Sequence, residues 1–132
     1  MKTDNELIAE FMGCVFMKEI AKVKYYNVPA WHIESHNASC GFFKYHTRWD
    51  WLMPVVEKIE SIRHIGIDAI YFKIEGKTCQ IWTYFDVKEF LRLTGDDKNE
   101  GNKFRVGHTA KTKIEATYHA CVDFIKWHNS QK

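Results

Sequence analysis

The spacing of hydrophobic and polar residues predicts helices near the start and in the middle of the chain. Residues 5–12 repeat hydrophobic side chains on one helical face, with Asp4 or Asn5 available as the N-cap. Proline is disfavoured in a helix interior, so a second helix is expected either to kink at Met53 or to begin with Pro54 in its first turn. We favour the second, because the residue before a proline avoids the α conformation. We expect this helix to end at Gly66. Its core stripe is Val55, Val56, Ile59 and Ile62.

The C-terminal helix is predicted to open with the capping pattern Thr112-x-x-Glu115 and to be apolar on two sides. One stripe consists of Ile114, Tyr118, Cys121, Val122 and Ile125. The other consists of Ala116, Ala120, Phe124 and Trp127. A helix that is apolar on two sides must be covered on two sides. We expect the sheet to cover one stripe, and a neighbouring helix or a second copy of the chain to cover the other. The second stripe is therefore the predicted oligomer interface.

Alternating hydrophobic and polar residues predict strands in the rest of the chain. The clearest hairpin joins residues 67–74 to residues 78–85 through the turn Glu75-Gly76-Lys77. An earlier strand is indicated where Ala21, Val23 and Tyr25 alternate with Lys22, Lys24 and Tyr26. The remaining predicted elements are strands at residues 30–33, 41–45 and 103–106, a short helix from Asp86, and a polar loop over residues 94–102.

These elements predict one α/β domain over residues 1–132, a three-layer sandwich with a mainly antiparallel sheet and helices on both sides. The hydrophobic fraction of 45% is enough for a sizeable core. Aromatic residues make up 15% of the chain, which is high enough that we expect some of them to be partly exposed at a ligand site or an interface.

The charges limit the classes of partner. The net charge is +2, from 19 basic and 17 acidic residues, which argues against a dedicated duplex-DNA binder. No uncharged run is long enough to cross a membrane. Acidic residues at Asp4, Glu6 and Glu10 do not fit a signal peptide, so we expect a cytoplasmic protein.

Four scattered cysteines, with no C-x-x-C pair, indicate reduced and mostly buried thiols. His32, His36 and Cys40 have a spacing that would suit zinc on a helix, but Pro29 and Gly41 make this segment non-helical. We therefore predict no metal and no cofactor. No nucleophile motif and no phosphate-binding glycine loop is present, so an enzyme is the less favoured prediction.

Basic and aromatic residues gather just before the central helix. Helix N-termini favour anions, arginine binds phosphate through two parallel hydrogen bonds, and tryptophan stacks on planar rings. The predicted ligand-binding set is Lys44, His46, Arg48 and Trp49. In the alternative interpretation, Trp49 and Trp51 only wedge the helix against the sheet, and Arg48 is solvated. A surface for single-stranded nucleic acid would use the same residue types, but the near-neutral charge counts against it.

Three blocks carry a resemblance to a known family: residues 5–13 (NELIAEFMG), 46–60 (HTRWDWLMPVVEKIE) and 113–129 (KIEATYHACVDFIKWHN). Together they resemble the small phage and prophage proteins grouped as the phage ABA-sandwich domain. The resemblance implies a sheet between helical layers and no assigned activity. Arg48 and His128 depart from the family pattern, in which a small polar residue and an aromatic are more usual. A site built on them would not be a family site.

The sequence therefore predicts a non-enzymatic phage or prophage accessory protein. We expect an oligomer that binds a small ligand of nucleotide type and so helps to evade host defences. One alternative is a protein-binding or structural accessory protein, and another is a small hydrolase.

Overall fold

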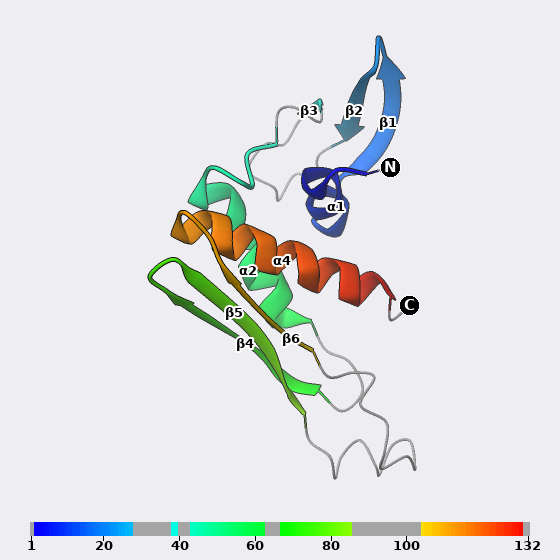
Figure 1. The fold of residues 1–132 in the computed structure, drawn as a ribbon. Coiled ribbons are helices and arrows are strands. Elements are labelled where there is room, and N and C mark those ends of the chain that lie inside the picture. Colours follow the sequence, from blue (N-terminus) through cyan, green and yellow to red (C-terminus); the bar gives the residue numbers. More distant parts are fainter. Residues whose placement is uncertain (1, 28–37, 40–42, 63–66, 86–103, 131–132) are drawn as a thin grey trace, which may run out of the picture.

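The computed structural model describes residues 2–27, 38–39, 43–62, 67–85 and 104–130 (Figure 1). Three helices and two three-stranded antiparallel sheets lie within these ranges, with the strand orders β1-β2-β3 and β4-β5-β6. In chain order the elements are α1 (Asp4–Phe11), β1 (Val15–Ile20), β2 (Val23–Asn27), β3 (Ala38–Ser39), α2 (Trp49–Ser61), β4 (Ile67–Glu75), β5 (Thr78–Phe85), β6 (Arg105–Thr109) and α4 (Lys113–Ser130).

The helices form one layer, in which α2 and α4 lie against the β4-β5-β6 sheet. α4 packs on β5 and β6, α2 packs on β4 and on α4, and α1 packs on α4 (Figure 1). The buried strand residues Ile70, Cys79 and Ile81 belong to the core that the helices complete. This confirms the predicted α/β class, with antiparallel strands and helices layered against a sheet. In the described residues α2 and α4 share one face of β4-β5-β6, and the other face carries exposed side chains.

The hairpin of β4 and β5 confirms the strongest strand prediction. Glu75 pairs with Thr78 across a two-residue turn, in which Gly76 has a φ of +58°. A positive φ at the first turn position only is the pattern of a type II′ turn, where glycine is favoured. The last strand, β6, starts two residues later than expected. It pairs with β5 from Thr78↔Thr109 to Trp82↔Arg105.

The start of α2 corrects the prediction made from Pro54. The helix begins at Trp49, and Pro54 lies inside it. Trp51 and Leu52 are thereby buried on the same stripe as Val55, Val56 and Ile59. Burying a large apolar side chain stabilises by about 1.5–3 kcal/mol, and a proline in a helix interior costs about 3 kcal/mol. Burial of two side chains therefore outweighs the proline.

The hairpin of β1 and β2 differs from the predicted strand. Ala21 and Lys22 form its turn, both with positive φ (52° and 67°), and Tyr26 rather than Tyr25 is buried. The Tyr26 hydroxyl donates to the buried Glu6 carboxylate at 2.9 Å, which ties the hairpin to α1. Burial alone would raise the pKa of Glu6, but hydrogen bonds from Tyr26 and Lys24 outweigh it and lower this pKa.

The second apolar stripe of α4 is buried inside the chain itself, which corrects the predicted oligomer interface. Ala116, Ala120 and Phe124 have no exposed surface, and Phe104 packs edge-on against Phe124 at 5.5 Å. Trp127 is partly buried at 5.1 Å from Phe104. The chain itself therefore covers this stripe, in part through Phe104 rather than through a neighbouring helix.

Several predictions fall outside the described residues. These concern His32, His36 and Cys40, the strand at residues 30–33, the helix end at Gly66, the helix from Asp86 and the loop at residues 94–102. Cys14, Cys79 and Cys121 are free and buried, as expected. None of the described helices combines the length and the apolar character needed to span a membrane.

Candidate functional site

The residues before α2 form a tight turn with an already paired arginine. The backbone N–H groups of Thr47 and Arg48 both donate to the Lys44 carbonyl oxygen, at 3.1 and 3.0 Å. The guanidinium of Arg48 donates to both carboxylate oxygens of Asp50, from Nε at 3.0 Å and from Nη2 at 2.6 Å. Both side chains are more than half exposed, so the pair adds little stability. It does hold Arg48 against its own helix.

His46, in the same turn, lies in a pocket at the N-terminal end of α4. The cavity has a volume of about 420 Å³. Its lining residues come from α1, the 43–48 turn and the start of α4: Asn5, His46, Thr112, Glu115, Tyr118 and His119. A volume of this size lies in the range of small-molecule sites.

Asn5 joins the three parts of this pocket. Its Oδ1 accepts a hydrogen bond from the Tyr118 hydroxyl at 3.0 Å, and its Nδ2 lies 3.2 Å from His46 Nδ1. The same Nδ2 is 3.4 Å from the carbonyl oxygen of Phe43. Because an amide nitrogen only donates, Nδ1 of His46 is the acceptor. A neutral His46 ring then carries its proton on Nε2.

Tyr118 is fixed both by burial and by its partner. Its side chain is buried, and its ring lies 5.9 Å from the ring of His46 and 5.5 Å from that of His119. Burial and the nearby negative charge of Asp4 raise the pKa of Tyr118 to about 12. At neutral pH its hydroxyl therefore remains a hydrogen-bond donor.

Polar side chains continue from the pocket along α4. Thr112 caps the helix by accepting from the backbone N–H of Glu115 at 3.2 Å, as the capping pattern predicts. His119 Nε2 lies 3.7 Å from Glu115 Oε1. Further along, His108 Nε2 lies 2.6 Å from Asp123 Oδ2. In the described part of the chain, no three or more His, Cys, Asp or Glu side chains are arranged to hold a metal ion.

The structure separates the four residues of the predicted ligand-binding set. His46 lines the pocket, whereas Lys44, Arg48 and Trp49 are not among its lining residues. Trp49 is 36% exposed at the start of α2, and Trp51 is buried in the core. In the alternative interpretation Trp49 and Trp51 wedge the helix and Arg48 is solvated. The burial of Trp51 and the exposure of Arg48 agree with it, whereas Trp49 is partly exposed.

Sequence reasoning missed most of the pocket. The sequence pattern indicates Asn5 only as a possible helix cap and Tyr118 only as a member of a core stripe. The sequence signal that could have indicated the pocket is the set of three blocks that carry the family resemblance, because each block contributes to the lining. The first contains Asn5, the second contains His46, and the third contains Glu115, Tyr118 and His119.

The described cysteines are poorly suited to nucleophilic chemistry. Burial raises the pKa of Cys14 to about 11 and raises the pKa values of Cys79 and Cys121 as well. A thiol in such surroundings stays protonated at neutral pH. The pocket offers instead hydrogen-bonding groups and two imidazole rings, which suit the binding of a small polar molecule.

Comparisons with known proteins identify no relative. The chain matches no protein-family model, no curated protein and no solved structure.

Proposed function

We propose that the protein is a non-enzymatic binder of a small polar ligand and that the pocket at the start of α4 is its binding site. The resemblance of the three sequence blocks to phage ABA-sandwich proteins is the reason to place it among phage or prophage accessory proteins. In that setting, capture of a nucleotide-type signal would help to evade a host defence.

One observation carries this proposal. A single cavity of about 420 Å³ is lined by one residue of the first block, one of the second and three of the third. Asn5, His46 and Tyr118 are far apart in the sequence but are joined by hydrogen bonds. A network of this kind fixes side chains before a ligand arrives, which reduces the entropy lost on binding.

The chemistry of the lining favours a ligand that has both a ring and an anionic group. The rings of His46 and Tyr118 offer planar contacts, and a neutral His46 donates from Nε2. The pocket lies at the N-terminal end of an 18-residue helix, where backbone N–H groups attract negative charge. Glu115 opposes an anion, but its carboxylate faces His119 at 3.7 Å.

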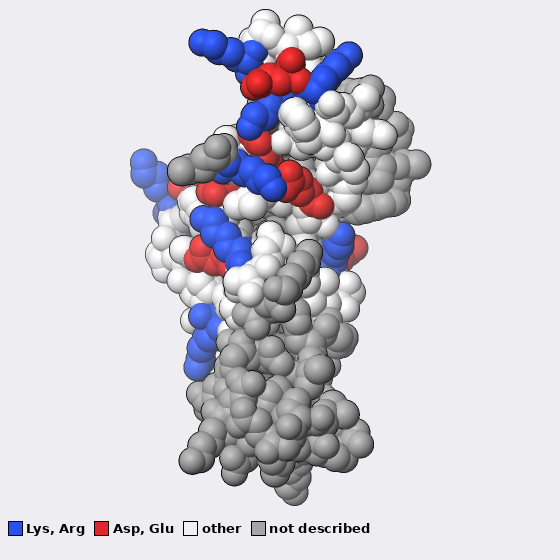
Figure 2. Space-filling view, turned by 90° about the vertical axis from the view of Figure 1, so that its right-hand side faces the viewer, with Lys and Arg blue, Asp and Glu red and all other residues white. Residues whose placement is uncertain are grey.

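A protein-binding role is the second candidate, and the β1–β2 hairpin favours it. Every residue of β1 is exposed, including Val15, Phe16, Met17 and Ile20. Figure 1 shows the hairpin projecting from the helical layer. Exposed apolar side chains in a cluster are typical of interaction surfaces. Basic and acidic side chains are interleaved over the described part of the face in Figure 2, so this side lacks the uniform charge of a polyanion-binding surface.

The proposal is tested by calorimetric titration of the whole chain with cyclic mono-, di- and trinucleotides and cyclic ADP-ribose isomers. Native mass spectrometry of protein from host cells would reveal a retained ligand. We expect His46→Ala and Asn5→Ala to weaken binding at least tenfold, because each removes a group that builds the pocket.

Arg48→Ala is the matched control, because Arg48 lies in the same turn but pairs with Asp50. It should leave the affinity within about twofold. If the wild type binds none of these compounds and carries no ligand from cells, the proposal is rejected. If Arg48→Ala abolishes binding while His46→Ala does not, the ligand lies at the start of α2 instead.

A further inference from the structure

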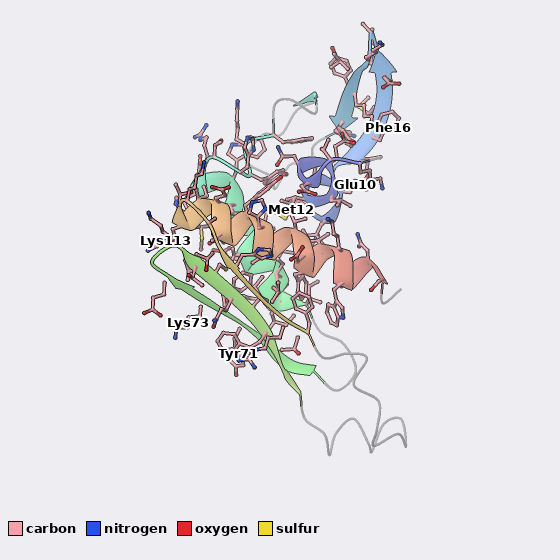
Figure 3. All side chains as sticks on the ribbon, in the orientation of Figure 1. Glu10, Met12, Phe16, Tyr71, Lys73 and Lys113 are labelled. Atoms are coloured by element: carbon pink, nitrogen blue, oxygen red, sulfur yellow. The ribbon has the colours of Figure 1, made fainter. Side chains whose placement is uncertain are left out.

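The outward face of the β4-β5-β6 sheet is a second surface, separate from the pocket. α2 and α4 cover its opposite face. Strand register brings its side chains into rows, in which Tyr71 pairs with Trp82 and Trp82 pairs with Arg105. In the next row, Lys73 pairs with Gln80. Figure 3 shows Tyr71 and Lys73 pointing away from α4.

An aromatic pair lies open on this face. The rings of Tyr71 and Trp82 stack with their centroids 5.7 Å apart and an angle of 28° between their planes. Tyr71 is 46% exposed, although a side chain of its size is usually packed away from water. Trp82 is half-buried beneath it, so the stacked pair provides a partly exposed flat apolar surface. The faces of nucleic-acid bases stack on such surfaces whatever their sequence.

Positive charge lies beside this aromatic pair and at the turn at the far end of the face, although the chain as a whole is close to neutral. Lys73 and Arg105 are exposed on the sheet, and Lys77 is exposed at the β4–β5 turn. The N–H of Ala110 donates to the Lys77 carbonyl oxygen at 3.0 Å, which places Lys111 beside that turn. The Lys111 side chain is exposed. The acidic residue among these rows is Glu75, which lies 3.4 Å from Lys73. The local charge therefore favours a polyanion.

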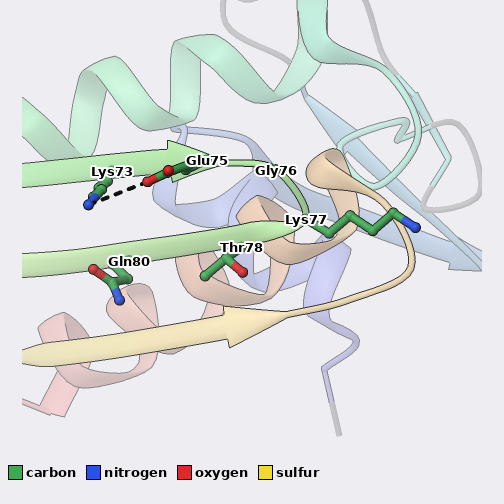
Figure 4. Close-up of a pocket in the computed structure, with 6 residues that line it drawn as sticks. All are labelled: Lys73, Glu75, Gly76, Lys77, Thr78 and Gln80. Carbon is green, nitrogen blue, oxygen red and sulfur yellow. Dashed lines mark ion pairs between the residues drawn. The ribbon is translucent and has the colours of Figure 1, made fainter.

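Two hollows lie at opposite ends of the sheet. One, of about 390 Å³, lies over the turn and is lined in part by Lys73, Lys77 and Gln80 (Figure 4). The other, also of about 390 Å³, is lined by Trp82, Thr83, Phe104 and Arg105. Between them Gly107 has no side chain, and a Cβ there would meet only Gln80 Cγ, at 3.5 Å. The face is therefore open from the turn to the position of Gly107, and the second hollow adjoins it beside Trp82 and Arg105.

We propose that this face binds single-stranded nucleic acid, with unpaired bases stacked on Tyr71 and Trp82 and with phosphates beside Lys73, Lys77 and Arg105. Trp82 and Lys77 are five residue steps apart, which corresponds to roughly 17 Å of extended chain, several times the ~3.4 Å rise per nucleotide of a stacked strand. The row therefore fits several nucleotides rather than one. A duplex hides its base faces inside its own stack, so it offers nothing to the aromatic pair.

The test is fluorescence anisotropy of the whole chain with a labelled oligothymidylate of about twelve nucleotides, beside a labelled duplex of the same length. We expect the single strand to bind at least tenfold more tightly than the duplex. The affinity for the single strand should fall with salt with a log–log slope of roughly −2, about 0.7 for each of three neutralised phosphates.

Two variants locate the contact. Tyr71→Ala should weaken binding about tenfold or more, as expected for loss of one stacked base. Gly107→Val should also weaken binding, because it fills the space between the hollows, while a β-branched residue suits the strand and keeps the thermal midpoint unchanged or higher. Phe16→Ala, which removes an exposed aromatic from the other sheet, should leave the affinity unchanged.

The proposal is overturned if no single strand binds at low salt, if the duplex binds equally well, or if Tyr71→Ala binds like the wild type. Flotation with vesicles of phosphatidylserine and phosphatidylcholine is run in parallel. Vesicle binding that needs Tyr71, without binding of oligonucleotide, would assign the face to a membrane surface and would also reject the proposal. His46→Ala should not change oligonucleotide binding, so this test and that of the pocket have independent outcomes.

Discussion

Tyr118 donates a hydrogen bond to Asn5 Oδ1 at 3.0 Å and so links α4 to α1 across 113 residues of sequence. The bond is part-buried, and the same asparagine holds His46. This polar contact therefore adds to the apolar packing of α1 on α4 and helps to shape the pocket.

Removal of this contact should lower stability measurably. Tyr118→Phe keeps the ring but leaves the Asn5 oxygen without this donor, so we expect a loss of about 1–2 kcal/mol in the free energy of unfolding. Urea denaturation followed by tryptophan fluorescence measures it. Tyr71→Phe is the matched control, because it removes the same hydroxyl from an exposed ring and should change stability by less than about 0.5 kcal/mol. Equal effects of the two variants would contradict the structural role of the Asn5 contact.

The raised pKa of Tyr118 also leads us to expect a lower free energy of unfolding at alkaline pH. Burial and the charge of Asp4 raise its pKa from the ordinary 10.0 to about 12 in the folded chain. Between these two values the folded state holds a proton that the unfolded state has lost, so the free energy of unfolding falls as the pH rises from 10 towards 12. Tyr118→Phe should flatten this dependence in urea titrations at several pH values. Cys14 acts in the same direction and is present in both proteins. If the free energy of unfolding falls equally steeply with pH in the wild type and in Tyr118→Phe, Tyr118 has the same pKa in the folded and unfolded states.

Relief of the strained turn between β1 and β2 should stabilise the hairpin. Ala21 and Lys22 both have positive φ, which costs roughly 1–2 kcal/mol for each ordinary residue. Asn-Gly is the preferred pair where both turn residues need positive φ. Ala21→Asn with Lys22→Gly should therefore slow amide exchange across the hairpin about fivefold or more. Lys22→Ala removes the charge and keeps the strain, so it should give no such protection. If the amide exchange rates of the two variants are equal, strain in the turn does not limit the stability of the hairpin.

Local patterns were enough to predict the β4–β5 hairpin because everything that defines it lies within one short segment. Its alternation and Gly76 at the turn are both visible in the sequence. The start of α2 was misplaced because the rule for Pro54 is local, whereas the burial of Trp51 and Leu52 depends on tertiary packing.

The pocket could not be predicted in this way. Periodicity correctly assigned Tyr118 to the inner side of α4, but it does not say which polar atom its hydroxyl will meet. Asn5 and His46 are separated by 41 residues, and no local pattern pairs them. The open aromatic pair was missed for the same reason, since only strand register brings Tyr71 opposite Trp82.

Phe124 lies in the core, although the sequence pattern indicates a place at an oligomer interface. The side chain has no exposed surface and packs against Phe104, Trp127 and His128. Phe124→Ala should cost about 3–5 kcal/mol, and Phe124→Asp should unfold the chain, because an unpaired carboxylate would be buried. Circular dichroism and sedimentation of these variants beside Lys126→Ala, an exposed neighbour on α4, measure both outcomes. A folded Phe124→Asp protein of lower mass than the wild type would restore the interface, because only a residue at a subunit contact could change the assembly and spare the fold.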